Sequence, residues 1–167
     1  MKNVFLLSFI LLLASCNSKR TLIGGFASLI SECSTNGNCS VELIRNKALV
    51  INGDEFGMHY STTDNHEKAI VIYKYSKIVK GNIQDAGYRE ELVFEIDNSV
   101  ENKTVTDLEL QNTKMLFGRF CYCKGQTGYY KVEKGKLEMN SNTKTIVVNF
   151  TVDEVPQVIK HVAISLN

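Results

Sequence analysis

Apolar and charged residues alternate with a period of two most clearly between Tyr88 and Asp97. One side of an extended chain would carry an apolar set and the other a charged set, namely Tyr88, Leu92, Phe94 and Ile96 against Arg89, Glu91, Glu95 and Asp97. Such a segment fits a strand with one face on a core and the other on water, which is typical of antiparallel sheets. The pattern therefore predicts an antiparallel strand over residues 88–97.

Comparable runs, rich in β-branched and aromatic residues, follow one another along the chain. They predict further strands at 41–45, 48–51, 56–60, 69–79, 107–111, 115–123, 129–133, 136–139, 145–152 and 158–166. Asn52-Gly53 indicates a type I′ turn between the second and third of these runs. Only residues 22–31 show apolar side chains at helical spacing, and Gly24 and Gly25 weaken that helix.

About ten strands with hairpin-sized links exclude a parallel α/β fold, because parallel neighbours need a crossover of a dozen or more residues. We expect an all-β fold built as a single antiparallel meander. To protect its edges, such a meander closes into a lipocalin-like barrel or folds into a β-sandwich, and the barrel is slightly favoured. Residues 22–167 show no internal repeat or linker and are expected to form a single β domain.

The charge balance excludes one class of partner. The chain of 167 residues has 19 basic and 18 acidic side chains, which gives a formal net charge of +1. Binding to a phosphate backbone needs a clustered positive face. Nucleic acid is therefore not an expected partner.

The first sixteen residues have the pattern of an export signal. Lys2 provides a positive start, residues 4–14 are almost wholly apolar, and Leu13-Ala14-Ser15-Cys16 ends the stretch. The apolar run is too short for a transmembrane helix, which needs about 20 residues, and is typical of a secretory signal. Its ending resembles the lipobox of bacterial lipoproteins.

That resemblance implies that residues 1–15 are removed as a signal peptide and that Cys16 is acylated, with residues 16–21 as the lipidated end and a short tether. The partner is then a membrane, bound through the N-terminal lipid, since several acyl chains give a stable anchor. Asn17 in place of Asp after the cysteine implies the outer membrane, and we expect the periplasmic face of the cell envelope. A plain secretory signal or a buried N-terminal helix is the alternative.

Four cysteines remain after Cys16, and an even number in an exported protein favours disulfides: Cys33, Cys39, Cys121 and Cys123. Residues i and i+2 of an extended strand lie too far apart for a disulfide, so a Cys121–Cys123 bond is disfavoured unless the strand kinks. We expect at least one bridge from Cys33 or Cys39 to Cys121 or Cys123. The alternatives are a local Cys33–Cys39 ring with two free thiols, and a soft-metal or redox site made of all four thiolates.

Catalytic motifs are mostly absent. The segment His66-Glu67-Lys68-Ala69-Ile70 begins like the zinc-protease H-E-x-x-H, but Ile70 takes the place of the second histidine. The three histidines are far apart in sequence, and the chain has no nucleophile elbow, Walker loop or dinucleotide fingerprint. We therefore expect no enzyme activity, no metal site and no cofactor.

Two charged residues interrupt the apolar side of predicted strands. Glu90 falls on the side of Leu92, and Lys160 falls on the side of Val162. A buried charge needs a partner, so each side chain is expected in a structural pair, at a wet strand end or in a ligand site at a barrel mouth. Arg119 raises the same question.

The loop 124–128 contains two glycines and leads into Tyr129-Tyr130. Aromatic rings supply rigid contact area and glycine permits close approach, which suits recognition, although an ordinary hairpin turn is the simpler interpretation. The candidate binding residues are Gln126, Tyr129, Tyr130, Glu90 and Lys160. We hypothesise a lipid-anchored binding module for a protein or small molecule, with a lipocalin-like carrier of a small apolar ligand as the alternative.

Overall fold

The structure is a computed structural model that describes residues 27–34, 36–81, 87–99 and 101–167. The predicted export signal, Cys16 and the predicted tether lie outside these residues, so the lipoprotein hypothesis stays a prediction. Within the described ranges, no helix is both long enough and apolar enough to cross a membrane.

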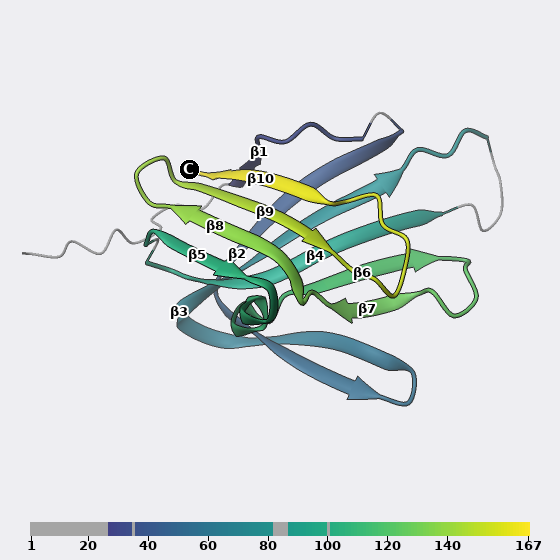
Figure 1. Ribbon diagram of the computed structural model, residues 1–167, viewed down its shortest axis with the longest axis horizontal. Coiled ribbons are helices and arrows are strands. Elements are labelled where there is room, and N and C mark those ends of the chain that lie inside the picture. The colour runs from purple at the N-terminus through teal and green to yellow at the C-terminus, as the bar shows by residue number, and fades with distance from the viewer. Residues whose placement is uncertain (1–26, 35, 82–86, 100) are drawn as a thin grey trace, which may run out of the picture.

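Ten antiparallel strands of the described chain form two five-stranded sheets (Figure 1). The first sheet has the order β1-β10-β9-β8-β5, with bounds Ala27–Leu29, His161–Leu166, Thr145–Thr151, Lys134–Asn140 and Lys103–Thr106. The second has the order β2-β3-β4-β6-β7, with bounds Gly37–Asp54, Gly57–Lys77, Tyr88–Asp97, Leu116–Cys121 and Gly128–Lys131. The expected all-β antiparallel fold is confirmed.

The chain moves between the two sheets instead of continuing as one meander. β1 pairs with β10 in the first sheet. After β4 of the second sheet, the chain returns to the first sheet, where β5 pairs with β8. A 3-10 helix, η1 (Asp107–Thr113), then leads back to β6. The two sheets pack as a sandwich. In addition, strands of the second sheet close into a small barrel.

This closure is produced by the long hairpin of β2 and β3. β3 pairs with β4 through residues 68–76, and near its start Met58 pairs with Tyr129 of β7. Strands β3, β4, β6 and β7 therefore close into a small barrel. Figure 1 shows the outer half of the hairpin extending below the two sheets. As a result, both faces of β4 are covered.

Each face of β4 contacts a different core. The main core lies between the sheets and includes Leu92, Phe94, Phe117, Val148 and Ile164. Within it, the rings of Phe117 and Phe150 are 5.8 Å apart. The smaller core fills the small barrel and consists of Leu49, Ile70, Ile72, Val93 and Leu116.

The predicted turn at Asn52-Gly53 is wrong. Both residues pair with β3, and the hairpin turns at Glu55-Phe56. The Asp54 side chain determines this position, because its Oδ1 accepts a hydrogen bond from the Phe56 N–H at 2.8 Å. Gly57 completes the turn with a φ of 121°, which a residue with a Cβ rarely adopts.

Neighbouring predicted strands are continuous in the structure. The runs 41–45 and 48–51 both belong to β2, and the runs 56–60 and 69–79 largely to β3. A bulge between Arg45 and Lys47, with Asn46 at a φ of 57°, shifts the register within β2. Such a bulge breaks the period of two without ending the strand.

Residues 107–111 form most of η1 and not the predicted strand. Their alternation does not reflect one strand face, because Leu108 is 70% exposed whereas Leu110 is fully buried. Gln111 fixes the helical turn, since its amide donates hydrogen bonds to the carbonyl oxygens of Met115 and Val132 at 2.9 and 2.8 Å. At the predicted helix over 22–31, the described residues Ala27–Leu29 form strand β1.

Candidate functional site

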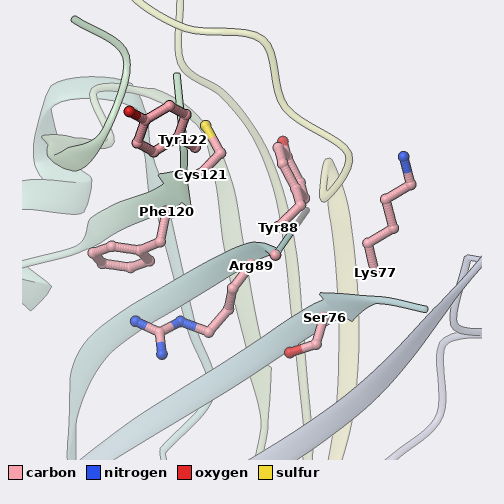
Figure 2. A pocket seen from close by; sticks show the side chains of 8 residues that line it. Ser76, Lys77, Tyr88, Arg89, Phe120, Cys121 and Tyr122 are labelled. Carbon is pink, nitrogen blue, oxygen red and sulfur yellow. The ribbon is translucent and has the colours of Figure 1, made fainter. Parts of the chain in front are cut away.

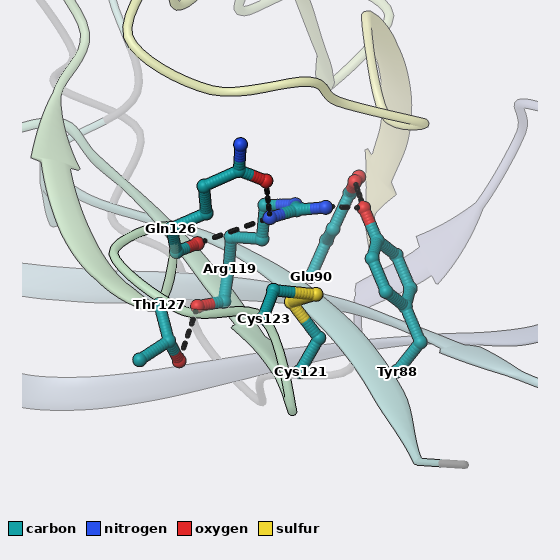
Figure 3. The surroundings of a disulfide bond; sticks show 7 residues. All are labelled: Tyr88, Glu90, Arg119, Cys121, Cys123, Gln126 and Thr127. Atoms are coloured by element: carbon teal, nitrogen blue, oxygen red, sulfur yellow. Dashed lines mark hydrogen bonds between the residues drawn. A yellow bond between two sulfur atoms is a disulfide. The ribbon is translucent and has the colours of Figure 1, made fainter.

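Two of the candidate binding residues, Gln126 and Glu90, lie at the end of the second sheet where β6 ends and β7 begins (Figure 3). Gln126 lies in the β6–β7 loop, and Glu90 lies near the start of β4. The pairing of β4 with β6 places Glu90 opposite Arg119. Antiparallel register thus brings together residues that are far apart in sequence.

The expected disulfides between the N-terminal segment and β6 are wrong. The structure pairs Cys33 with Cys39, and Cys121 with Cys123. The strand-geometry argument fails because β6 ends at Cys121 and the chain bends at Tyr122. This bend brings the two Cα atoms of the second pair to 5.1 Å, within the range of a disulfide.

The four cysteines do not form one cluster. Cys39 lies on β2 and Cys121 on β6, with β3 and β4 between them. Three interstrand spacings, about 14 Å measured along the sheet, separate the two strands. Among the described residues, no group of three or more metal-ligating side chains is arranged to hold a metal ion.

Arg119 is the central residue of this end of the sheet. Its side chain is almost fully buried, and its NH1 group donates hydrogen bonds to the backbone oxygen and Oε1 of Gln126 at 3.1 and 2.9 Å. The hydroxyl of Thr127 in turn donates to the Arg119 carbonyl at 3.1 Å. The loop is thus held to β6 from both sides, while Gln126 itself remains exposed.

Arg119 also connects this loop to Glu90. Its Nε donates to the Tyr88 hydroxyl at 3.3 Å, and that hydroxyl donates to Glu90 Oε1. Burial, followed by the hydrogen bond to Glu90, raises the pKa of Tyr88, so the phenol remains protonated as the donor. Figure 3 shows these side chains beside the Cys121–Cys123 disulfide.

Glu90 is fully buried and has a structural role. Its carboxylate accepts hydrogen bonds from the backbone N–H groups of Val158 and Ile159 at 2.7 to 2.9 Å. These bonds attach the connection before β10 to the second sheet and satisfy a charge that would be costly to bury alone. Among the described residues, the partners of Glu90 are backbone N–H groups and Tyr88, in place of the structural pair, wet strand end or ligand site that the sequence suggested.

The expectation that Lys160 shares an apolar strand face is wrong. β10 begins at His161, and Lys160 precedes it as an exposed residue. The period of two shifts before this strand, since Val158 is 46% exposed and Ile159 is buried. Lys160 lines a small surface pocket together with Tyr73 and Tyr75.

Tyr129 and Tyr130 point to opposite covered faces of β7. Tyr130 packs against the main core, whereas Tyr129 enters the small barrel and donates a hydrogen bond to Glu91 Oε1 at 2.9 Å. The Tyr60 hydroxyl donates to the same oxygen at 2.8 Å. Burial, together with the Glu91 carboxylate, raises the pKa of Tyr60 to about 12 and that of Tyr129 further. Tyr129 is therefore a structural residue.

Glu91 is a buried residue that the sequence pattern placed on a water-facing side. It is 4% exposed, because the β2–β3 hairpin covers the second face of β4. Glu95 lies on the same face of β4. It accepts a hydrogen bond from the Leu49 N–H and another, at 2.9 Å, from the Lys114 ammonium group. The residues of β4 itself give no indication that a hairpin from another part of the chain covers this face.

An open pocket of about 560 Å³ lies across the ends of β3, β4 and β6 (Figure 2). It is lined by the cations Lys77 and Arg89, the rings of Tyr88, Phe120 and Tyr122, and no carboxylate among the described residues. The guanidinium carbon of Arg89 lies 4.3 Å from the centre of the Phe120 ring. Tyr122, between the two cysteines, is 86% exposed. This surface was not identified from the sequence.

Comparisons with protein-family models, curated proteins and solved structures gave no match. The chemistry of this end of the second sheet is therefore the basis for assigning a function. It combines a fixed loop, exposed aromatic and cationic side chains, and a disulfide within one short segment.

Proposed function

We propose that this chain is a lipid-anchored binding module of the bacterial cell envelope. Its contact surface, called here the loop-end surface, consists of Arg89, Tyr122, Lys124, Gln126 and Thr127, all of which are exposed. The two halves of the proposal, the anchor and the contact surface, are independent and are tested separately.

The observation that carries the contact surface is the pair of hydrogen bonds from Arg119 to Gln126. They hold an exposed loop in one conformation before any partner binds. A loop that is already ordered loses less conformational entropy on binding, which increases affinity.

The charge of this surface indicates the kind of partner. Lys77 and Arg89 line the pocket at this surface, and no described carboxylate lines it. Lys124 directly follows Cys123 in the β6–β7 loop. Tyr122 and Phe120 supply flat apolar area beside these cations. Aromatic and arginine side chains are the residue types that most often dominate binding energy. We propose a protein partner that presents carboxylates next to apolar side chains.

Packing between the sheets favours surface binding over the carrier alternative. The main core fills that space with side chains from both sheets, among them Phe94, Phe117 and Phe150. A lipocalin-like carrier needs an internal volume for its ligand. The three surface residues Arg89, Tyr122 and Gln126 need no such volume, since they already face solvent.

The test of the contact surface is photo-crosslinking in membranes. A photoreactive amino acid in place of Gln126 is expected to capture a partner, because this position is exposed at the centre of the surface. The same amino acid in place of Lys103, which is exposed on β5 of the other sheet, serves as the control. Equal capture at both positions would exclude the loop-end surface as the specific contact.

The test of the anchor is Cys16→Ser. Loss of the acylated thiol is expected to release the protein from the membrane fraction or to leave the signal peptide uncleaved. Membrane retention of a correctly cleaved Cys16→Ser protein would contradict the lipid anchor, whatever the outcome at Gln126.

A further inference from the structure

The Cys121–Cys123 disulfide contributes little to holding the fold together. Both cysteines belong to one segment, and β6 is already paired with β4 up to Cys121 and with β7 up to Arg119. In the chain-entropy view, a disulfide stabilises less as the loop it closes becomes shorter. A bond across a single intervening residue is among the weakest of these constraints. Stabilisation of the fold therefore does not explain why the Cys121–Cys123 disulfide is present.

The surroundings of this disulfide are cationic. Arg119 lies two residues earlier on the same strand face as Cys121, and Lys124 directly follows Cys123. Lys77 and Arg89 line the pocket that Cys121 borders. Nearby cations favour the thiolate form of a cysteine, which makes it a better leaving group and lowers the cost of reduction.

The acidic and phenolic groups at this end cancel only part of that effect. Hydrogen bonds do not remove the charge of a carboxylate, so Glu90 offsets Arg119, to which Tyr88 connects it. Lys77 and Arg89 line the pocket beside Cys121 with no described carboxylate among its lining residues. Tyr88 stays protonated, because burial and Glu90 raise its pKa. Tyr122 is exposed to solvent.

The disulfide is also accessible from solvent. Cys121 and Cys123 are both partly exposed, and Tyr122 between them projects outward. The open pocket of about 560 Å³ in Figure 2 adjoins Cys121 and provides room for an extended peptide. An attacking thiolate needs this kind of approach to a disulfide sulfur.

From these observations we propose that Cys121 and Cys123 form a redox-active pair that exchanges disulfides with dithiols of other exported proteins. The activity goes beyond the proposed binding and does not depend on its partner. The second disulfide, Cys33–Cys39, is its internal reference, because Glu32 flanks Cys33 in place of a cation.

The exchange balances without a further reactant. A substrate thiolate attacks one sulfur of the Cys121–Cys123 bond, forms a mixed disulfide and releases the other cysteine as a thiolate. The second substrate thiolate then attacks the substrate sulfur of the mixed disulfide and releases the remaining cysteine. Two electrons and two protons pass from the substrate dithiol to Cys121 and Cys123, and the substrate acquires the disulfide.

The first test is a redox titration of the purified full chain against reduced and oxidised glutathione, followed by alkylation. Trypsin places each pair in its own peptide, Phe120–Lys124 and Thr21–Arg45, so the two disulfides are measured separately. We expect Cys121–Cys123 to be reduced with an equilibrium constant about 100-fold more favourable than that of Cys33–Cys39. Equal reduction of the two pairs, or later reduction of Cys121–Cys123, would overturn the proposal.

The second test measures oxidation of a model peptide that contains two cysteines. The oxidised protein is expected to accelerate formation of the peptide disulfide about tenfold over an equal concentration of oxidised glutathione. The paired change Cys121→Ser and Cys123→Ser should abolish this acceleration, and the paired change Cys33→Ser and Cys39→Ser should preserve it. Acceleration that survives loss of Cys121 and Cys123 would refute the assignment. The titration decides the question if a serine variant fails to fold.

Discussion

The buried Arg119 side chain donates hydrogen bonds to both the backbone oxygen and the side-chain oxygen of Gln126, at 3.1 and 2.9 Å. One cation therefore fixes both the path of the β6–β7 loop and the direction of its exposed amide side chain. Because Arg119 also donates to Tyr88, which donates to Glu90, the loop is joined to the connection that precedes β10. The loop-end surface is thus ordered by contacts beneath it.

Arg119→Met should loosen this loop. The substitution keeps apolar volume but removes the donors to Gln126, and hydrogen bonds from charged groups contribute about 1.5 to 3 kcal/mol each. Amide hydrogen exchange at residues 124–127 is expected to become at least about tenfold faster. Lys131→Met, at an exposed position of β7, is the matched control and should leave these rates unchanged. Unchanged exchange in Arg119→Met would show that the loop is held by other contacts.

Glu91→Leu should destabilise the small barrel. It leaves the hydroxyls of two partly buried residues, Tyr60 and Tyr129, without their acceptor, at a cost of about 2 to 4 kcal/mol in the free energy of unfolding. Glu91→Gln keeps an acceptor in the same place and should cost less. Chemical denaturation measures both values, and equal stability of the two variants would contradict the role given to the carboxylate.

The raised pKa of Tyr60 makes stability sensitive to alkaline pH. In the unfolded chain this phenol titrates near 10, whereas burial and Glu91 raise its pKa in the fold to about 12. The folded state therefore holds the proton more tightly, and the free energy of unfolding should fall as pH rises from 10 through 12. Tyr60→Phe should lessen this slope in denaturation curves measured across that range. A slope unchanged by Tyr60→Phe would count against the hydrogen bond to Glu91.

Gly118→Ala tests the packing of the Tyr129 and Phe120 rings against the backbone of β6. A Cβ at this position would lie 2.6 Å from the Tyr129 ring and 2.7 Å from the Phe120 ring. Moving these rings should cost about 1 to 3 kcal/mol of unfolding free energy. At Gly53 the added Cβ meets nothing within 4 Å, so Gly53→Ala is the matched control for thermal denaturation.

The sequence predicted best the bounds of strands whose residues alternate in type. The segment 88–97 forms β4 with the predicted bounds, and 145–152 matches β9 to within one residue. Alternation failed where the pattern has another cause. Leu108 and Leu110 alternate with polar residues in η1, and the bulge at Asn46 interrupts a strand that continues.

The candidate site was only partly predictable for the same physical reason. The loop around Gln126 and the unusual position of Glu90 are visible in the sequence, because both break a local rule. The environment of Glu91 depends on Tyr60 and Tyr129, and the link from Arg119 to Glu90 depends on Tyr88, all of which are far away in the chain from the residue they contact. The Cys121–Cys123 bond depends on where β6 ends, which strand periodicity does not specify to one residue.

The most direct test of the binding proposal is the affinity of the partner captured at Gln126 for three purified forms of the protein. These are the natural chain, the paired change Arg89→Gln and Tyr122→Ser, and the control Lys103→Gln on the opposite sheet. If the loop-end surface is the contact, the paired change should raise Kd at least about tenfold. The control should not change it. Equal Kd values for all three forms, with unchanged thermal midpoints, would contradict the account.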